Sequence, residues 1–265
     1  IASSLVQRGN TIETLIGGQA DDSFNFADQA SLASGDSGTT YSEIDAQGGA
    51  ADLLNYTAFS NAHAVTVNLK LNQATGVSRV SAVENITGGA GDDSLTGNDE
   101  SNVLRGGFGD DILVGLLGDD YYMFLDGWGA DQVIENSNDP TNPGGGNDTL
   151  SFYAYSGDTV AFAAQPVTAD LDFRLDNSAQ WDTVTDVANP GNNLRFNARQ
   201  IEYTFAGTGS DSLYTLDQDS TFNLDGVIVD TDPRFTPDQA PVMVAAGDRN
   251  AYTALNDPYS LEFAN

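Results

Sequence analysis

A nine-residue repeat between residues 88 and 123 constrains the fold more than any other feature of the sequence. The four segments read GGAGDDSLT, GNDESNVLR, GGFGDDILV and GLLGDDYYM. They follow the pattern G-G-x-G-x-D-x-U-x, where U is an apolar residue. Glycine permits a tight turn over the first six positions, because it adopts positive φ at little steric cost. The last three positions read as a short strand. Two repeats then form one coil, and repeats two apart stack in the same sheet.

The sixth position of the repeat carries an acid or an amide, and the eighth carries U. The U residues are expected to point into a core, and they are Leu95, Leu104, Leu113 and Tyr122. The sixth-position residues are Asp93, Asn102, Asp111 and Asp120. Stacking brings these side chains together with the turn carbonyls, and a cage of about six oxygens suits Ca²⁺. The spacing therefore predicts ions between turns 88–93 and 106–111, and between turns 97–102 and 115–120.

Three of the repeats place a second acid directly before the sixth-position Asp, so that the sequence reads GDD. On the predicted geometry these fifth-position carboxylates point to solvent, and the residues bind the ion through their backbone carbonyls. The predicted metal ligands on these turns, besides the sixth-position residues, are Gly88, Ala90, Asp92, Gly106, Phe108, Asp110, Gly115, Leu117 and Asp119. The doubled acid therefore predicts unequal roles for its two members.

The charge of the chain also points to a bound cation. Its 265 residues carry a formal net charge of −30, with 32 Asp, seven Glu, nine basic residues, one His and no Cys. This balance disfavours binding to nucleic acid or to an anionic membrane surface. An apolar content of 40% at regular positions disfavours disorder. Because the chain has no Cys, its available metal ligands are Asp carboxylates and backbone carbonyls, which favour a hard ion and above all Ca²⁺. We expect several Ca²⁺ ions to bind.

A longer repeat surrounds the nonapeptides. Residues 12–24, 83–95 and 201–213 align without a gap, as do residues 48–59 and 144–155. The alignment, together with the turn at 126–131, adds five predicted metal ligands: Asp22, Asp52, Asp131, Asp148 and Asp211. The same alignment places a glutamate at one matching position in each segment: Glu13, Glu84 and Glu202. These glutamates either bind ions or cap the stacked strands, or they accept a hydrogen bond from a neighbouring turn. We predict a solenoid over 1–220 with excursions at 25–47, 60–82 and 156–200, and a cap or linker over 221–265.

The stretch 88–123 resembles the RTX (repeats-in-toxin) nonapeptide repeat of hemolysin-type calcium-binding proteins, and 119–136 is similar to a segment that often follows such repeats. The resemblance implies an all-β, right-handed parallel β-roll with Ca²⁺ between stacked turns. It also implies type I secretion from a Gram-negative bacterium and folding on Ca²⁺ outside the cell. The sequence departs from the pattern where Asn102 replaces Asp, where Glu100 and Ala20 replace Gly, and where the turn 206–211 begins with Ala.

Two function classes stay open. The first is an extracellular structural or adhesive protein, such as a segment of an adhesin, matrix or surface-layer protein, with a surface or matrix ligand or end-to-end assembly into fibres. The second is a calcium-binding accessory domain of a secreted hydrolase or toxin. We expect no enzyme, because the single histidine, His63, lies near no recognisable nucleophile motif. We expect no membrane insertion, because no run of 18 apolar residues occurs. The start at Ile1 is read as a processed product or a fragment.

Overall fold

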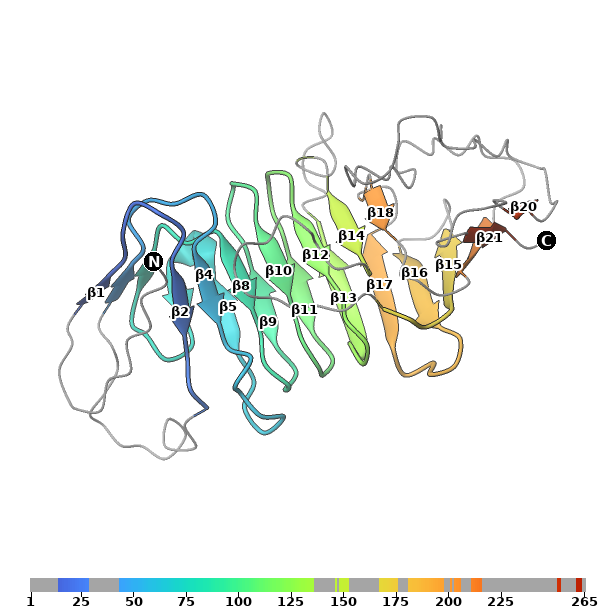
Figure 1. Cartoon of the computed structure of the whole chain (residues 1–265), viewed down its shortest axis with the longest axis horizontal. Helices are drawn as coiled ribbons and strands as arrows, with labels where there is room; N and C mark the ends of the chain where they lie inside the picture. Colours follow the sequence, from blue (N-terminus) through green and yellow to red (C-terminus); the bar gives the residue numbers. More distant parts are fainter. Residues whose placement is uncertain are drawn as a thin grey trace.

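The computed structural model describes residues 14–28, 43–135, 146, 148–152, 167–175, 181–197, 201, 203–205, 211–215, 252–253 and 261–263. These residues form short strands that stack in layers along the longest axis of the molecule (Figure 1). The only helix among them is a 3₁₀ turn, η2 (Leu69–Leu71). None of them forms a helix that is long and apolar enough to cross a membrane.

Two large sheets carry the stacked coils. The first, sheet B, has seven strands that pair only in parallel: β2 (Ser23–Asn25), β4 (Leu53–Asn55), β8 (Asn85–Thr87), β10 (Val103–Arg105), β12 (Tyr121–Met123), β14 (Thr149–Ser151) and β18 (Tyr203–Phe205). The second, sheet C, begins with β6 (Gln73–Ala74), β5 (Thr66–Asn68), β9 (Ser94–Thr96), β11 (Ile112–Val114) and β13 (Ala130–Ile134). Within 88–123 the chain alternates between the two sheets, so two nonapeptides make one coil as predicted.

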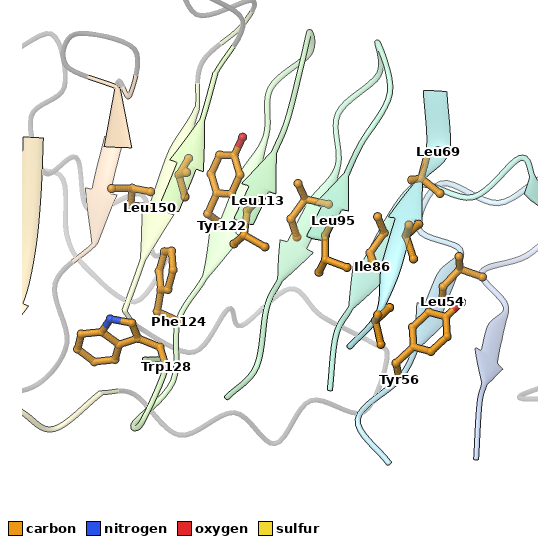
Figure 2. Close-up of a cluster of buried hydrophobic side chains, with 14 of the residues drawn as sticks. Leu54, Tyr56, Leu69, Ile86, Leu95, Leu113, Tyr122, Phe124, Trp128 and Leu150 are labelled. Atoms are coloured by element: carbon orange, nitrogen blue, oxygen red, sulfur yellow. The ribbon is translucent and has the colours of Figure 1, made fainter. Parts of the chain in front are cut away.

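The strand register follows the nine-residue period. Leu95 pairs with Leu113 in sheet C, and Leu104 pairs with Tyr122 in sheet B, each pair 18 residues apart. All four of these U residues have no exposed surface. They continue into a buried column with Leu54, Ile86 and Leu150 (Figure 2). The predicted parallel β-roll and its core are therefore confirmed for the repeat.

Beyond β13 the structure departs from a uniformly parallel roll. Sheet C continues with β17 (Asn193–Asn197), β16 (Trp181–Asp186), β15 (Leu171–Leu175), β19 (Asp211–Thr215), β21 (Leu261–Phe263) and β20 (Tyr252–Thr253). The pairs β15–β16 and β16–β17 are antiparallel, so these three strands form a meander inside the sheet. These antiparallel strands lie within residues 156–200, which were predicted to form an excursion from the solenoid. Strand β21, from the predicted cap or linker, pairs in parallel with β19.

A third, smaller sheet lies toward the N-terminal end. It joins β1 (Thr14–Ile16), β3 (Glu43–Asp45) and β7 (Val80–Ser81) in parallel. Strand β5, within the expected excursion 60–82, is an ordinary layer of sheet C next to β9. Its other edge pairs with the two-residue antiparallel strand β6. Parts of two expected excursions, around β3 and β5, are thus integrated into sheets.

Candidate metal sites in the stacked turns

The predicted acidic ligands line up in two columns, one along each large sheet. Column C, just before or at the start of strands in sheet C, holds Asp93, Asp111 and Asp131. Column B, just before strands in sheet B, holds Asp22, Asp52, Asn102, Asp120 and Asp148. All of these residues except the half-buried Asp22 are no more than 2% exposed. Buried carboxylates at this density need compensation by hydrogen bonds, protons or a cation.

One oxygen of most of these carboxylates is used to join layers. Asp93 N donates to Asp111 Oδ1 at 2.7 Å, and Asp111 N donates to Asp131 Oδ1 at 2.9 Å. In column B, Asp120 N donates to Asp148 Oδ1 at 2.9 Å, and Asn102 N donates to Asp120 Oδ1 at 2.8 Å. Each Oδ1 thus accepts from the backbone of the preceding layer. This ladder fixes where the second oxygen, Oδ2, points.

The second oxygen of Asp93 accepts a hydrogen bond from Gly89 N at 2.6 Å, but that of other acids in the columns lacks such compensation. Oδ2 of Asp52, Asp111 and Asp120 is buried and receives no hydrogen bond from the described residues. A buried acceptor without a partner costs about 1–3 kcal/mol, and more when it is charged. A hard cation that binds these oxygens would remove that cost.

The turn glycines leave room for such a cation. A Cβ placed on Gly88 would lie 2.2 Å from Asp93 Oδ2 and 2.2 Å from the carbonyl oxygen of Gly106, in the next layer. A Cβ on Gly106 would lie 2.0 Å from Asp111 Oδ2. The carboxylate and carbonyl oxygens therefore converge on spaces that only glycine keeps open. This is the oxygen-only donor set that Ca²⁺ prefers, so the residues fit the ion.

The electrostatics of column C agree with this fit. Burial raises the pKa of Asp93 to about 6, that of Asp111 to about 8 and that of Asp131 to about 9. Neighbouring carboxylates add to the shift: Asp92, Asp93 and Asp110 all raise the pKa of Asp111. Without a cation, the folded column therefore retains protons that an unfolded chain would release.

Comparison with protein families gives one match, over residues 86–122, to four copies of the RTX calcium-binding nonapeptide repeat. Residues 86–122 are RTX calcium-binding repeats. The comparison with curated proteins gives no match. The resemblance in the sequence is thus confirmed for this segment, and it marks the chain as calcium-binding. RTX repeat proteins are typically secreted, and they form a parallel β-roll like the one seen in sheets B and C.

The two acids of each RTX GDD differ as predicted in exposure. Asp92, Asp110 and Asp119 are exposed, whereas the sixth-position acids are buried. The fifth-position carboxylates still have a structural contact, because Asp92 Oδ1 accepts from Asp110 N at 3.0 Å and Asp110 Oδ1 accepts from Ala130 N at 2.9 Å. Asp92 and Asp110 thus form an outer hydrogen-bond ladder beside the buried one, which was not expected from the sequence.

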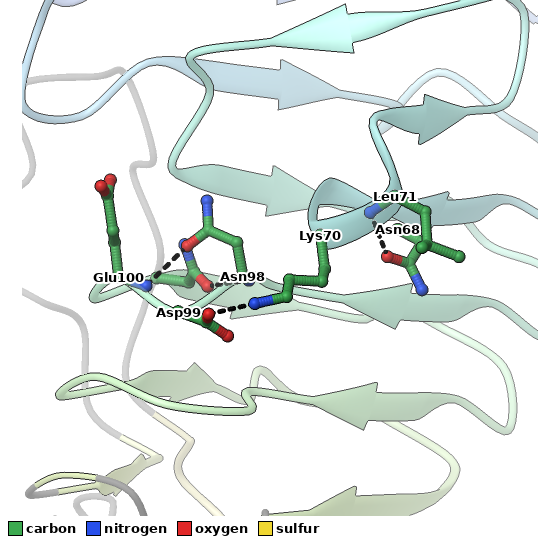
Figure 3. Close-up of polar contacts among 7 residues, drawn as sticks. Asn68, Lys70, Leu71, Asn98, Asp99 and Glu100 are labelled. Atoms are coloured by element: carbon green, nitrogen blue, oxygen red, sulfur yellow. Dashed lines mark hydrogen bonds and ion pairs between the residues drawn. The ribbon is translucent and has the colours of Figure 1, made fainter.

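The RTX turn 97–102 compensates its buried side chain with hydrogen bonds from the protein. Asn102 Oδ1 accepts from Asn98 N at 2.7 Å, and Asn102 Nδ2 donates to the Glu84 carbonyl at 2.7 Å. The ammonium group of Lys70, from the 3₁₀ turn η2, contacts Asp99 of this turn, and Glu100 N donates to Asn98 Oδ1 (Figure 3). The amide group of Asn102, which replaces the usual carboxylate, thus has hydrogen bonds from the protein at both its oxygen and its nitrogen. The single lysine of the chain forms an ion pair at the same turn.

Glu84 occupies a place in column B that the nonapeptide pattern did not reveal. It lies directly before β8, between the layers of Asp52 and Asn102, and its Oε2 accepts from Asp52 N at 2.9 Å. Of the alternatives for the in-phase glutamates, the hydrogen bond to a neighbouring turn is therefore seen at Glu84. The signal was present in the sequence, since Glu84 precedes its strand as the sixth-position Asp does. Glu13 and Glu202 lie outside the described residues.

The other predicted ligands are only partly placed. The Gly106 carbonyl faces the space beside Gly88, and the Gly115 carbonyl lies 2.9 Å from where a Cβ on Gly97 would be. Ala90, Phe108 and Leu117 lie on the expected turns, and their carbonyls stay predicted ligands. Asp211 is the first residue of β19, and its side chain lies outside the described residues.

His63 does not have the geometry of a catalytic triad. Its Nδ1 lies 2.6 Å from Asp28 Oδ1 and 3.3 Å from Ser60 Oγ. In a serine–histidine–aspartate relay, the carboxylate and the hydroxyl contact opposite ring nitrogens. The same contacts suit a structural link, because Ser60 N also donates to Asp28 Oδ2 at 3.0 Å.

Substitution of a turn glycine tests the RTX cradle directly. We expect Gly88→Ala to weaken Ca²⁺-driven folding strongly, because its methyl group would overlap Asp93 Oδ2 and the Gly106 carbonyl, each 2.2 Å away. The matched control is Gly191→Ala, since nothing lies within 4 Å of a Cβ at Gly191. Calcium titrations followed by circular dichroism measure both midpoints. Equal midpoints for the two variants would contradict a cradle at Gly88.

The pKa values give a second expectation, for the chain without calcium. A carboxyl whose pKa is higher in the folded than in the unfolded state stabilises the fold below the unfolded value, about 4. That contribution is lost as pH rises through about 6, 8 and 9 at Asp93, Asp111 and Asp131. In EDTA, β structure should therefore increase on acidification from pH 9 to 4. With Ca²⁺ present, acid should raise the calcium midpoint, because protons compete for the same oxygens. Circular dichroism in EDTA and calcium titrations across this pH range check the two signs.

Proposed function

We propose that the chain is an extracellular structural or adhesive protein that folds when it binds several Ca²⁺ ions after secretion. The observation that carries this proposal is column C, in which the buried Asp111 Oδ2 has no partner among the described residues and its neighbouring charges are carboxylates. Ca²⁺ would supply the missing charge to Asp93, Asp111 and Asp131. Sites of extracellular modules bind Ca²⁺ at about 10⁻⁴–10⁻³ M. At such affinity the chain stays unfolded in a calcium-poor cytosol and folds outside the cell.

An elongated stack supports the structural or adhesive class. The coils add along one axis (Figure 1), and a repeat architecture of this kind presents extended faces on which a surface or matrix ligand can bind. We further propose that the chain is not itself an enzyme, in keeping with the contacts of its single histidine. A Gram-negative source and type I secretion belong to the same proposal, and they rest on the RTX segment.

End-to-end assembly would have to use the ends of the sheets. At the N-terminal end of sheet B, β2 pairs on one side only among the described residues, which leaves an edge for another strand. In sheet C the corresponding edge of β5 is occupied by β6. A fibre contact is therefore proposed at β2 rather than at β5.

Electron microscopy of the purified chain in millimolar Ca²⁺ tests the assembly. Fibres that disappear in EDTA and are reduced by Ser23→Pro would support it, because the backbone of Asp22 and Phe26 faces β4 and that of Ser23 therefore faces the open edge. Monomers at every concentration would count against fibre formation and favour the alternative, a calcium-binding accessory domain of a secreted hydrolase or toxin. The sequence that flanks this chain within its own gene decides between the classes: a protease or lipase domain upstream supports the accessory role, and further repeats support the structural one.

A further inference from the structure

Three buried acids from different turns meet at one place on the sheet B side of the roll. One carboxylate oxygen from each of Asp120, Glu135 and Asp148 lies within 4.8 Å of the others. Each residue is at most 2% exposed. Asp120 comes from the last RTX turn, whereas Glu135 and Asp148 lie outside the matched segment. The cluster is therefore not a product of the nonapeptide pattern alone.

Strand register explains how Glu135 reaches the cluster. In sheet C, Val114 pairs with Ile134, so Glu135 lies beside Gly115, the first residue of the neighbouring turn. An acid thus occupies the place where the RTX pattern has glycine. Asn197 Oδ1 accepts from Glu135 N at 3.0 Å and holds the backbone from the next strand, β17.

Tyr122 adds a fourth oxygen. It is the last U residue, it is fully buried, and its hydroxyl donates to Glu135 Oε1. Figure 2 shows its ring in the core, with the hydroxyl directed away from the leucine column. The other three repeats have leucine at this position, which offers no polar group. The tyrosine of the last repeat instead supplies a hydroxyl that donates to the Glu135 carboxylate.

The oxygens enclose a small space beside Gly115. A Cβ on Gly115 would lie 2.2 Å from Asp120 Oδ2, 2.3 Å from the Tyr122 hydroxyl and 2.7 Å from Glu135 Oε1. Asp120 is 1% exposed, and its Oδ2, which points into this space, receives no hydrogen bond from any described residue. The ladder bond from Asn102 N uses only Oδ1. A buried carboxylate oxygen therefore faces other acid oxygens with its own charge uncompensated.

We propose that Asp120, Glu135, Asp148 and the Tyr122 hydroxyl form a separate cation site that closes the C-terminal end of the RTX repeat. The ligand is a hard divalent cation of the Ca²⁺ class, because every donor is an oxygen and the donors include three carboxylates. Mg²⁺ fits less well, since it retains several waters and the acids here are almost fully buried. The site goes beyond the proposed stacking of ions between RTX turns, because two of its acids come from outside the match.

The ion content of the full-length chain tests this site. Ca²⁺ bound per folded chain is measured by native mass spectrometry for the wild type, for Glu135→Gln and for the control Glu100→Gln. Glu100 is exposed on the preceding turn of the same side, and it undergoes the same chemical change. We expect Glu135→Gln to lose one ion and Glu100→Gln to lose none. An unchanged count in Glu135→Gln would overturn the proposal and imply that protons neutralise the cluster.

A measurement on the wild type covers the case in which Glu135→Gln does not fold. Crystals grown with Tb³⁺ in place of Ca²⁺ should show an anomalous peak in contact with Asp120, Glu135 and Asp148. Peaks only between the RTX turns would refute this site and leave calcium-dependent folding intact. The absence of all peaks in a folded chain would refute both.

Discussion

In EDTA at neutral pH the chain is expected to lose most of its β-sheet circular dichroism, and millimolar Ca²⁺ is expected to restore it. The reason lies in column C, where burial raises the pKa of Asp111 to about 8 and that of Asp131 to about 9. At pH 7 the metal-free fold must hold protons that the unfolded chain releases, or else bury charged carboxylates side by side. Either choice disfavours the folded state.

Calcium reverses this balance because it binds only the assembled turns. An ion that binds the native but not the unfolded state stabilises the fold in proportion to the logarithm of its concentration. Circular dichroism and small-angle scattering follow the transition, and Mg²⁺ at the same ionic strength controls for general screening of the net charge of −30. A β signal that survives EDTA at neutral pH would show that calcium is not coupled to folding. Equal rescue by Mg²⁺ would show that screening suffices.

The second large effect is expected at Asp111. Asp111→Ala should raise the calcium midpoint by about tenfold or more, since loss of even a residue that only orients a metal ligand typically costs about 10–100-fold in affinity. Its carboxylate also accepts from Asp93 N at 2.7 Å, so the variant loses a ladder bond as well. Asp111→Asn separates the two losses, because an amide keeps one acceptor oxygen and removes the charge.

Asp110→Ala is the matched control, because Asp110 is the exposed neighbour in the same GDD. It should lose one exposed hydrogen bond, from Ala130 N, worth about 0.5–1.5 kcal/mol. Its calcium midpoint should therefore shift much less than that of Asp111→Ala. Calcium titrations of both variants give the comparison. Equal shifts would mean that the assignment of buried and exposed positions in the repeat does not describe the ligands.

Much of the repeat could be predicted from its period. Nine residues make one turn and one strand, so the positions of Asp111 and Leu113 relative to the coil axis follow from counting, and both are buried as expected. The same counting places Asp110 on the surface. These predictions succeeded because each depends on local geometry that four adjacent repeats impose on one another.

The features that the sequence did not reveal depend on contacts between distant segments. Strand β17 of the meander pairs with β13, with paired residues 63 positions apart, and no period signals that the strands of the meander reverse direction. Glu135 becomes part of a cluster only because Ile134 pairs with Val114. The sequence shows an acid, Glu135, where the repeat has glycine, and a tyrosine, Tyr122, where the repeat has leucine. That the two side chains are in contact depends on the strand register of both sheets, which the sequence does not show.

The hydrogen-bond ladder gives the stack a direction along its axis. Each layer offers backbone N–H groups toward the C-terminal side, as Asp93 does to Asp111, and carboxylate oxygens toward the N-terminal side. A second copy that continued this direction at the edge of β2 would therefore join head to tail. Such a contact is heterologous, and it generates an open polymer with a defined polarity unless its rotation closes a ring. A symmetric dimer through the same ends would place like groups against each other, so any filament of this chain should grow with all its subunits pointing one way.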